Sequence, residues 1–189
     1  MRWDALFADL EAQLYSAGQL ALETETNERA RMDQAALALT DRLRGQLGAA
    51  LRVRLAGGVD FDGQLSHVGS TWIVLDEPTR SVLVTLDAVQ LVEGLGRSTV
   101  PQDPGRPQRL GLASALRALA RDREEVLLYL SPGRDGGFRT IAGTVDRVGK
   151  DFLEIAAVPL GEARRAGNVR GVYAVPFNAV AAVASARRS

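Results

Sequence analysis

The spacing of apolar residues along this chain changes near residue 50. Before that point apolar residues recur every three or four positions, first from Trp3 to Leu14 and again from Ala36 to Leu47. This spacing places each set along one face of a helix. The polar segment between them, residues 23–33, contains no helix breaker. We therefore expect an N-terminal helical segment over residues 1–48, ending at Gly48.

From residue 51 onward, apolar residues alternate with polar ones or form short β-branched runs, which is typical of strands. The run "LRVRL" opens the series, "AGGVDFDG" at residues 56–63 supplies a turn, and the last run is "VQLV" at residues 89–92. Five strands in so short a stretch favour a small twisted barrel over an open sheet.

The strand pattern returns after a linker and a helix. Residues 96–108 contain three prolines, the composition of a linker. Residues 110–125 place leucines on one helical face, and five further strand-like runs follow up to residue 183. The predicted domains are an N-terminal helical segment, 1–48; a first repeat, 49–95; a linker, 96–108; and a helix with a second repeat, 109–189.

The sequence "GQLSHVGSTWIVL" at residues 63–75 is repeated in outline by "GTVDRVGKDFLEI" at residues 143–155. The first glycine of each copy falls inside a strand, where glycine often marks a sharp bend. The second lies at a turn, where a positive φ angle is expected, and an aromatic residue follows it. We interpret both copies as strand two, its turn and strand three of a duplicated module. The residues given a structural role are Gly63, Gly69 and Trp72 in the first copy and Gly143, Gly149 and Phe152 in the second.

The order of residues in this module resembles that of Sm-like proteins, in particular tandem proteins of bacterial type. The best matches are Gly63-x-Leu65 and Leu86-Asp87-Ala88-Val89, and the likeness covers residues 35–93 and 110–184 in outline. The resemblance implies a short helix followed by five strongly bent strands, and commonly assembly into rings through edge strands. We therefore predict a mainly β fold of the α+β class: two Sm-like five-stranded small barrels, each preceded by a helix, behind the N-terminal helical segment.

The nucleotide-binding motifs of that family are missing from this chain. Its RNA-binding members typically carry Asp and Met-Asn near strand three and Arg-Gly before the last strand. Trp72-Ile73 and Phe152-Leu153 stand at the Met-Asn places, and Thr85-Leu86 and Pro176-Phe177 stand at the Arg-Gly places. The resemblance thus implies a fold, and an RNA ligand only weakly.

The composition excludes several classes of protein. The chain has no cysteine, which excludes disulfides and thiolate metal sites. No apolar run is long enough to span a membrane. Two Asp and a Glu interrupt the apolar residues of the N-terminal stretch, whereas a secretory signal needs a basic start and an uninterrupted apolar run, so we expect no such signal. We expect a cytoplasmic protein with no membrane contact, no metal and no cofactor.

The zero net charge hides a division between the two halves. Residues 1–95 hold 8 basic and 14 acidic side chains, whereas residues 96–189 hold 15 and 9. Such asymmetry marks a nucleic-acid-binding half, a chain whose ends attract partners of opposite charge, or chance. Phosphate binding needs several cations on one surface, and in single-strand binders aromatic residues such as Phe138 and Tyr173 stack bases. The alternative to a nucleic-acid site is a solvated arginine loop whose neighbouring aromatic residues belong to the core. The nucleic-acid-binding candidates are Arg134, Arg139, Arg147, Lys150, Arg164, Arg165 and Arg170.

No catalytic constellation emerges from the sequence. His67 is the sole histidine, and its counterpart in the second repeat is Arg147, so a surface strand residue is favoured over a triad or metal ligand. Asp60 and Asp62 lie beside glycines, where carboxylates cap turns more often than they do acid–base work. The stretch "SPGRDGGFR" lacks the spacing of a phosphate loop and predicts a hairpin turn. We therefore expect that the protein is not an enzyme.

One predicted strand is apolar on both faces. Trp72 and Val74 point to the opposite side from Ile73 and Leu75, so both sides need cover. The N-terminal helices, the other repeat or another subunit are the alternatives. Our first hypothesis is a non-enzymatic binding or scaffolding module with a regulatory role, which binds a protein partner or itself. The second is a nucleic-acid-binding regulator that uses the basic second repeat.

Overall fold

A computed structural model describes residues 28–101, 110–133, 137–162, 165 and 167–185, apart from Ala30 and Asp33. The chain divides into two compact units, Met1–Leu39 and Thr40–Ser189. In the first unit the described residues between 28 and 35 are helical. The predicted helical stripe from Trp3 to Leu14 lies outside the described residues.

The second unit is built mainly of strands. Its elements are α2 (Leu39–Arg44, which begins at the boundary), β1 (Ala50–Leu55), β2 (Asp60–Val68), β3 (Trp72–Glu77), β4 (Arg80–Thr85), the 3-10 helix η1 (Leu86–Ala88), β5 (Val89–Glu93), α3 (Leu112–Asp122), β6 (Glu125–Leu130), β7 (Arg139–Val148), β8 (Phe152–Ala157), β9 (Gly171–Pro176), the 3-10 helix η2 (Phe177–Ala179) and β10 (Val180–Ser185).

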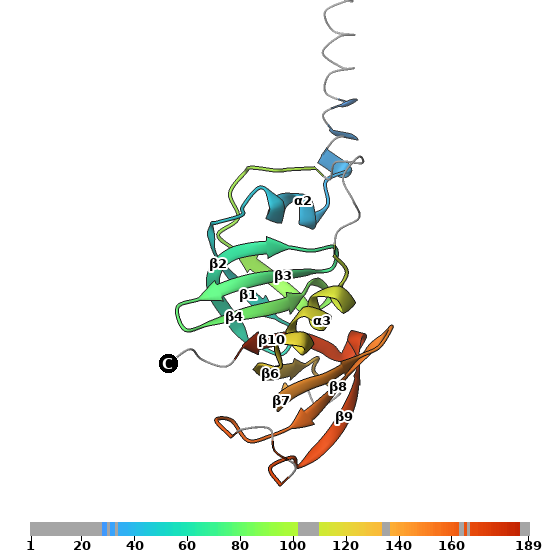
Figure 1. Ribbon diagram of the computed structural model, residues 1–189. Helices are drawn as coiled ribbons and strands as arrows, with labels where there is room; N and C mark the ends of the chain where they lie inside the picture. The colour runs from blue at the N-terminus through green and yellow to red at the C-terminus, as the bar shows by residue number, and fades with distance from the viewer. Residues whose placement is uncertain are drawn as a thin grey trace, which may run out of the picture. The chain divides into compact units, whose positions relative to one another are not determined.

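These strands form one antiparallel sheet of ten strands in the order β5-β1-β2-β3-β4-β10-β6-β7-β8-β9. In Figure 1, β10 (dark red) lies between the strands of the first half (cyan to green) and those of the second half (orange). The prediction of two Sm-like barrels, each preceded by a helix, is therefore wrong, because the strands belong to a single open sheet. Alternation of apolar residues predicts that a segment is a strand, but not which strand lies beside it.

The individual strands agree with the sequence pattern, with one exception. Residues 56–63 were expected to form a turn, yet β2 begins at Asp60. Phe61 within this stretch is only 1% exposed and belongs to the core. The burial of this aromatic side chain outweighs the turn preference of the Asp and Gly residues around it.

The two halves of the sheet repeat the same hairpin. Leu65 pairs with Leu75 between β2 and β3, and Val145 pairs with Ile155 between β7 and β8. Both ladders shift register directly after this pair, before His67 in one and before Arg147 in the other. The repeated sequence therefore specifies strand two, its turn and strand three in both halves.

The second glycine of each repeated sequence lies beneath an aromatic ring. A Cβ atom on Gly69 would lie 2.3 Å from the ring of Trp72, and one on Gly149 would lie 2.3 Å from the ring of Phe152. In each turn the glycine N–H donates to the carbonyl oxygen of that aromatic residue at 2.8 Å. Neither glycine has a positive φ angle, contrary to our prediction. Glycine is required here because the ring occupies the space of a side chain.

The first glycine of each repeated sequence allows two strands to approach closely. A Cβ atom on Gly63 would lie 2.8 Å from the Asp76 carbonyl oxygen, and one on Gly143 only 2.0 Å from the Ala156 carbonyl oxygen. Backbone atoms cannot rotate away as a side chain can. These positions therefore exclude any side chain at the bend.

Strands β4 and β10 join the two halves. Val82, Leu83 and Val84 lie opposite Ala184, Val183 and Ala182, and all six residues are buried. Two side-chain hydrogen bonds reinforce the ladder. The Thr85 hydroxyl oxygen lies 2.8 Å from the Val180 carbonyl oxygen, and the Ser81 N–H donates to the Ser185 hydroxyl at 3.0 Å.

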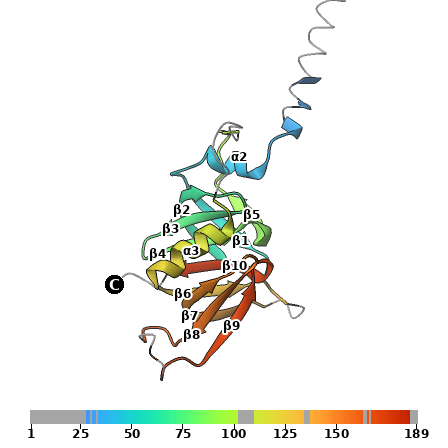
Figure 2. The same cartoon turned by 45° about the vertical axis from the view of Figure 1, so that its right-hand side comes forward.

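The junction strands separate two hydrophobic cores. Val82 and Val84 belong to the core of the first half, whereas Leu83 belongs to the core of the second half together with Trp72. Of the three alternatives for covering the two-faced strand, the structure shows the other repeat, because Ile73 and Leu75 lie in the first core and Trp72 on the opposite face lies in the second. Leu43 of α2 is fully buried in the first core and Leu116 of α3 in the second. Figures 1 and 2 both place α3 at the boundary between the halves, next to β10.

Residues 96–100 of the predicted linker run along α2 and the turn that follows it. The Arg42 Nη2 donates to the Gly96 carbonyl at 2.7 Å, and the Arg44 Nη1 donates to the Val100 carbonyl at 3.0 Å. Arg44 is 6% exposed and also pairs with Asp41. Of the apolar stripe predicted from Ala36 to Leu47, only Leu43 is buried. Leu47 lies in the turn after α2 and is 55% exposed.

We predict that Gly143→Ala lowers the free energy of unfolding by about 1–3 kcal/mol, because its Cβ would collide with backbone. Chemical denaturation followed by circular dichroism measures this change. Gly133→Ala is the control, since a Cβ there meets nothing within 4 Å. Equal losses in both variants would contradict a close approach at Gly143.

We also predict that Leu83→Ala lowers the free energy of unfolding by about 2–4 kcal/mol, because it leaves a cavity between the two halves. As both halves share one sheet, amide hydrogen exchange should report the same loss of protection for peptides from β2 and from β7. A loss confined to one half would show that the halves unfold independently.

Candidate functional site

The predicted basic residues do not form one surface. Arg139 opens β7 and Arg147 lies near its other end, so the strand separates them. Arg147 Nε lies 3.6 Å from Glu154 Oε2, whereas Lys150 and Arg165 are exposed. Arg134 and Arg164 lie outside the described residues. The structure therefore places Arg147 and Lys150 at the β7–β8 turn and Arg139 and Arg170 around the start of β7, with Arg165 in neither group.

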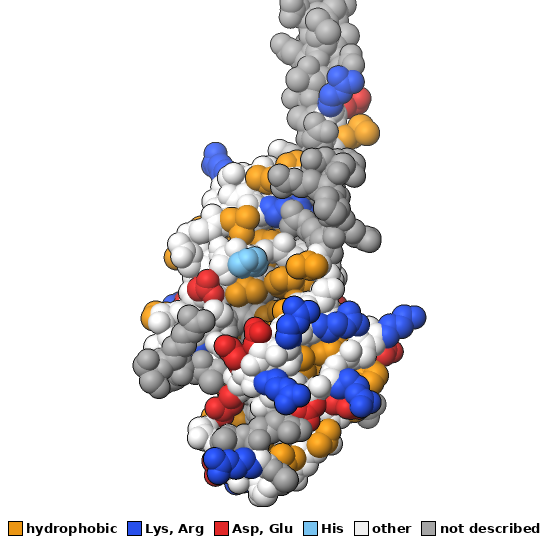
Figure 3. Space-filling model, in the orientation of Figure 1, with side chains coloured by type: hydrophobic (Ala, Val, Ile, Leu, Met, Phe, Trp, Pro, Cys, Tyr) orange, Lys and Arg blue, Asp and Glu red, His pale blue; other side chains and the backbone are white. Residues whose placement is uncertain are grey.

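The group at the β7–β8 turn includes a residue that the sequence did not single out. Arg117 of α3 donates from Nη2 to the Gly149 carbonyl at 3.0 Å, which brings a third cation close to Arg147 and Lys150. Figure 3 shows Lys and Arg side chains interspersed with Asp and Glu on the face of the molecule that it presents. At the β7–β8 turn the carboxylate of Glu154 offsets part of the charge of Arg147, which weakens attraction for phosphate there.

The group at the start of β7 surrounds a cavity of about 470 Å³. Arg139, Arg170 and Tyr173 line it, and its apolar floor is formed by residues such as Ile141 and Val158. Both arginines are exposed, and within the described part of the chain neither guanidinium has an ion-pair or hydrogen-bond partner. The cavity thus combines two uncompensated cations with an aromatic ring.

Local backbone contacts hold the walls of this cavity in place. The Arg170 N–H donates to the Ala157 carbonyl at 2.9 Å, and the Val158 N–H donates to the Ala142 carbonyl at 3.0 Å. Tyr173 is 48% exposed. A Cβ on Gly171 would lie 3.3 Å from the Tyr173 hydroxyl, so glycine at 171 leaves room for this ring beside the strand.

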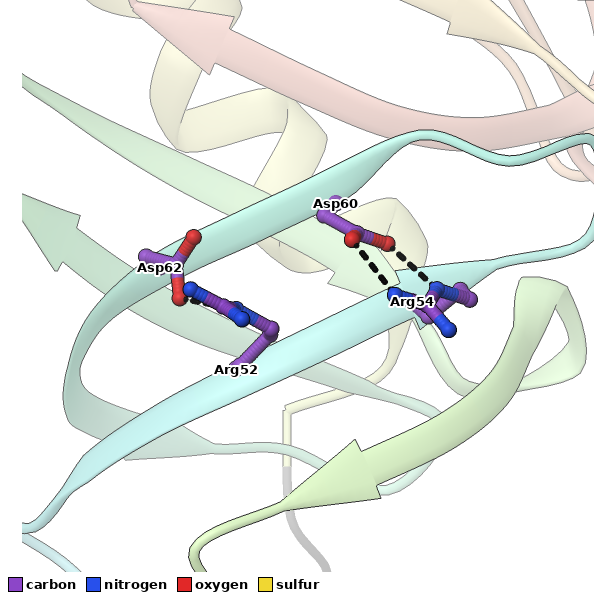
Figure 4. A network of polar contacts seen from close by, with 4 residues as sticks. All are labelled: Arg52, Arg54, Asp60 and Asp62. Atoms are coloured by element: carbon purple, nitrogen blue, oxygen red, sulfur yellow. Dashed lines mark hydrogen bonds and ion pairs between the residues drawn. The ribbon is translucent and has the colours of Figure 1, made fainter.

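The corresponding hairpin of the first half carries ion pairs instead (Figure 4). Arg54 Nε and Nη2 donate to the two oxygens of Asp60 at 2.8 and 2.9 Å, and Arg52 Nε donates to Asp62 Oδ1 at 2.6 Å. The hydrogen bond from Arg54 holds the pKa of Asp60 below its usual range. Asp60 and Asp62 therefore do not cap a turn as predicted; each pairs directly across the strands with an arginine.

A second cavity, of about 750 Å³, lies beside this hairpin and is acidic. Its charged lining residues are Arg52, Asp62, Asp76, Glu77 and Glu93. Asp76 accepts a hydrogen bond from Ser81 and Glu77 one from Arg80. Because several of these carboxylates already have hydrogen-bond or ion-pair partners, the cavity has less uncompensated negative charge than the number of its acidic residues would indicate.

His67 is exposed on β2, as predicted for a surface strand residue. It lines a third cavity, of about 450 Å³, between α3 and strands β2, β3, β4 and β10. In Figure 3 it is the single pale blue side chain, surrounded mostly by apolar side chains. Asp76 lines the same cavity, where its Oδ1 accepts a hydrogen bond from the Ser81 hydroxyl at 2.6 Å, and within the described residues no hydrogen bond joins it to His67.

The two outer strands of the sheet are the other exposed feature. Among the described strands, β5 pairs only with β1, and β9 pairs only with β8. Val172 and Tyr173 on β9 are 58% and 48% exposed, and Leu91 on β5 is 44% exposed. An uncharged edge strand such as β9 is a ready template for pairing with another strand.

The described residues hold no group of three or more His, Asp or Glu side chains that could bind a metal ion. None of the helices among them is long and apolar enough to cross a membrane. The absence of enzymatic activity stays a prediction from the sequence.

The chain matches no known protein-family model, and no curated protein sequence matches it. The resemblance to Sm-like proteins has no support from either comparison. The two exposed features of the structure that bear on function are the sheet edges and the basic cavity.

Proposed function

We propose that this protein is a non-enzymatic scaffold that binds further copies of itself, head to tail, through the two outer strands of its sheet. The observation that carries the proposal is the internal pairing of β4 with β10. Strand β4 is the fourth strand of the first half and β10 the fifth strand of the second half. Strand β9 is the fourth strand of the second half, and β5 is the fifth strand of the first half. The open edge of β9 in one copy is therefore suited to pair with the open edge of β5 in another, as β4 pairs with β10.

The burial of individual residues supports this pairing. On β4, Leu83 faces the core of the other half, and its counterpart on β9 is Ala174, which is exposed. On β10, Ala182 belongs to the core of the first half, and its counterpart on β5 is the exposed Leu91. Positions that contact the other half at the internal junction are thus solvent-exposed at the open edges.

The open edges lack two contacts of the internal junction. Pro176 stands in β9 where β4 has Thr85, and Gly94 follows β5 where β10 has Ser185. The hydroxyl hydrogen bonds of Thr85 and Ser185 therefore have no counterpart. We expect pairing between copies to be weaker than the internal junction, and hence reversible with concentration.

The two edges differ, so this contact is heterologous: it links copies into a closed ring or an open filament and does not stop at a two-fold dimer. In such an array the cavities of all copies would lie at a regular spacing along the assembly. A scaffold functions by arranging binding sites in this way. An unrelated protein that adds a strand to β9 is the competing outcome.

We predict that Ala174→Lys shifts the protein from assemblies toward single chains, because a charged side chain on the outward face of an edge strand opposes pairing. Leu91→Lys should act in the same way from the other edge. Analytical ultracentrifugation over a range of concentrations measures the change. Gln64→Lys, which adds the same charge at an exposed position on the internal strand β2, is the control.

The register of the internal junction gives a sharper prediction. Val183 lies opposite Leu83, so Val92 of one copy should lie opposite Ala174 of the next. Because the chain has no cysteine, a variant with Val92→Cys and Ala174→Cys should form a ladder of cross-linked chains under mild oxidation. Val92→Cys with Val172→Cys, which is out of register, should cross-link much less. A natural chain that stays single at every concentration would refute the scaffold proposal.

A further inference from the structure

We propose that the second half of the sheet carries a nucleotide-binding site, in which Arg139 and Arg170 bind the phosphate and the base lies against Tyr173. The ligand class is a phosphorylated nucleoside, either free or as one unit of a single strand. The site goes beyond the scaffold function, because it requires no contact between copies.

The charges of the cavity point to an anionic ligand. Arg139 and Arg170 line the same space, both are exposed, and neither has a carboxylate partner among the described residues. Arginine side chains in proteins usually meet an acceptor, and the planar guanidinium matches phosphate oxygens in a bidentate manner. Glu162, the acidic residue closest in sequence to Arg170 among the described residues, does not line the cavity.

The rest of the cavity points to a ligand that also has a flat apolar part. Tyr173 is 48% exposed although its neighbour two positions on, Val175, is 5% exposed. Exposed aromatic rings beside cations are the means by which proteins stack bases without reading their sequence. A volume of about 470 Å³ lies within the range of small-ligand pockets.

Comparison of the two halves shows that this site is a departure from the shared pattern. Asp60, Asp62 and Glu77 occupy positions in the first half that Thr140, Ala142 and Ala157 occupy in the second. The residues paired across the strand also change, since Leu127 lies opposite Ala142 where Arg52 lies opposite Asp62. At these three positions the second half therefore carries no carboxylate, so none of them can pair with Arg139 or Arg170. A cavity whose arginines meet no carboxylate at these places is suited to an anion.

The nucleotide site and the assembly edge use different faces of β9. Ala174 points away from the cavity, whereas Tyr173 lies opposite Ile155 on the side of the second core. Leu91→Lys, which tests assembly from β5 at the far edge of the sheet, should therefore leave nucleotide binding unchanged. Failure of one proposal is in this way distinguishable from failure of the other.

The test measures binding of two probes by the full chain at low salt: AMP by equilibrium dialysis, and a short fluorescent single-stranded RNA of mixed sequence by anisotropy. Arg139→Gln with Arg170→Gln should weaken binding about tenfold or more. For the RNA, it should also flatten the log–log salt slope by about 1.4. Tyr173→Leu, which keeps an apolar side chain, should weaken binding about fivefold or more.

The matched control is Arg147→Gln with Lys150→Gln, which removes the same charge at the opposite end of β7. It should leave both affinities close to those of the natural chain. Because all five side chains are exposed, thermal unfolding should be the same in every variant. Binding of both probes would show that free nucleotides are ligands. Binding of RNA alone would show that the cavity accepts a nucleotide only as part of a single strand. Either result supports the site.

Three results would overturn the proposal. The first is no binding of either probe at low salt. The second is that the control variant weakens binding as much as the cavity variants, which would assign binding to diffuse positive charge or to the β7–β8 turn. The third is that polyglutamate displaces AMP or RNA equally well, which would show a site for anions or acidic peptides that does not recognise a base.

Discussion

The hydrogen-bonded pairing of β4 with β10 is the interaction on which the rest of this structure depends. It joins segments from the two halves of the second unit that lie far apart in the sequence, and both strands carry apolar residues on both faces. Ordering so long an intervening chain has an entropic cost that grows only slowly with length. Burial of Val82, Leu83 and Val84 against β10 offsets that cost at about 25 cal/mol per Å² of apolar surface. Each core is then completed by side chains from the other half.

This junction explains why two similar halves differ in chemistry. The outer face of the β1–β2 hairpin is open to solvent, and there the chain places Arg52, Arg54 and their aspartates. At the matching places in the second half, Leu127 and Tyr129 pack against the first core, and Tyr129 meets Phe61 edge to face with ring centroids 5.3 Å apart. Charged pairs there would have to be desolvated, which costs more than an exposed ion pair returns.

Both proposals concern regions that the junction leaves at the periphery of the sheet. Pairing uses one fourth strand and one fifth strand, and so it leaves one of each unpaired at the outer edges. In the β6–β7 hairpin, Leu127 and Tyr129 pack against the first core where the first half has Arg52 and Arg54, and Ala142 and Thr140 stand in place of the paired aspartates. The proposed assembly surface and the proposed anion site would both follow from joining two copies of one module in a single sheet.

The sequence by itself determined the local structure of this protein. Alternating apolar residues and short β-branched runs placed the ten strands, the helical spacing of leucines placed α3, and the repeated spacing of Gly69 to Trp72 and of Gly149 to Phe152 marked two hairpin turns. These features depend on neighbours within a few residues, which a linear pattern records. The ring that covers each glycine was not predicted, since a positive φ angle was expected there instead. The sequence also named Arg139, Arg170 and Tyr173, but only among other candidates.

Only the tertiary structure decided which strands are neighbours, and this is where the prediction of separate barrels was wrong. The pairing of Val84 with Ala182 depends on two distant segments that are each apolar on both faces, and many pairings satisfy such a pattern equally well. The same holds for the candidate site. Proximity of Arg139 to Arg170, and the separation of Arg147 from both, follow from how β7, β8 and β9 run side by side. Spacing along the chain carries no record of that arrangement, because it arises from contacts across the sheet.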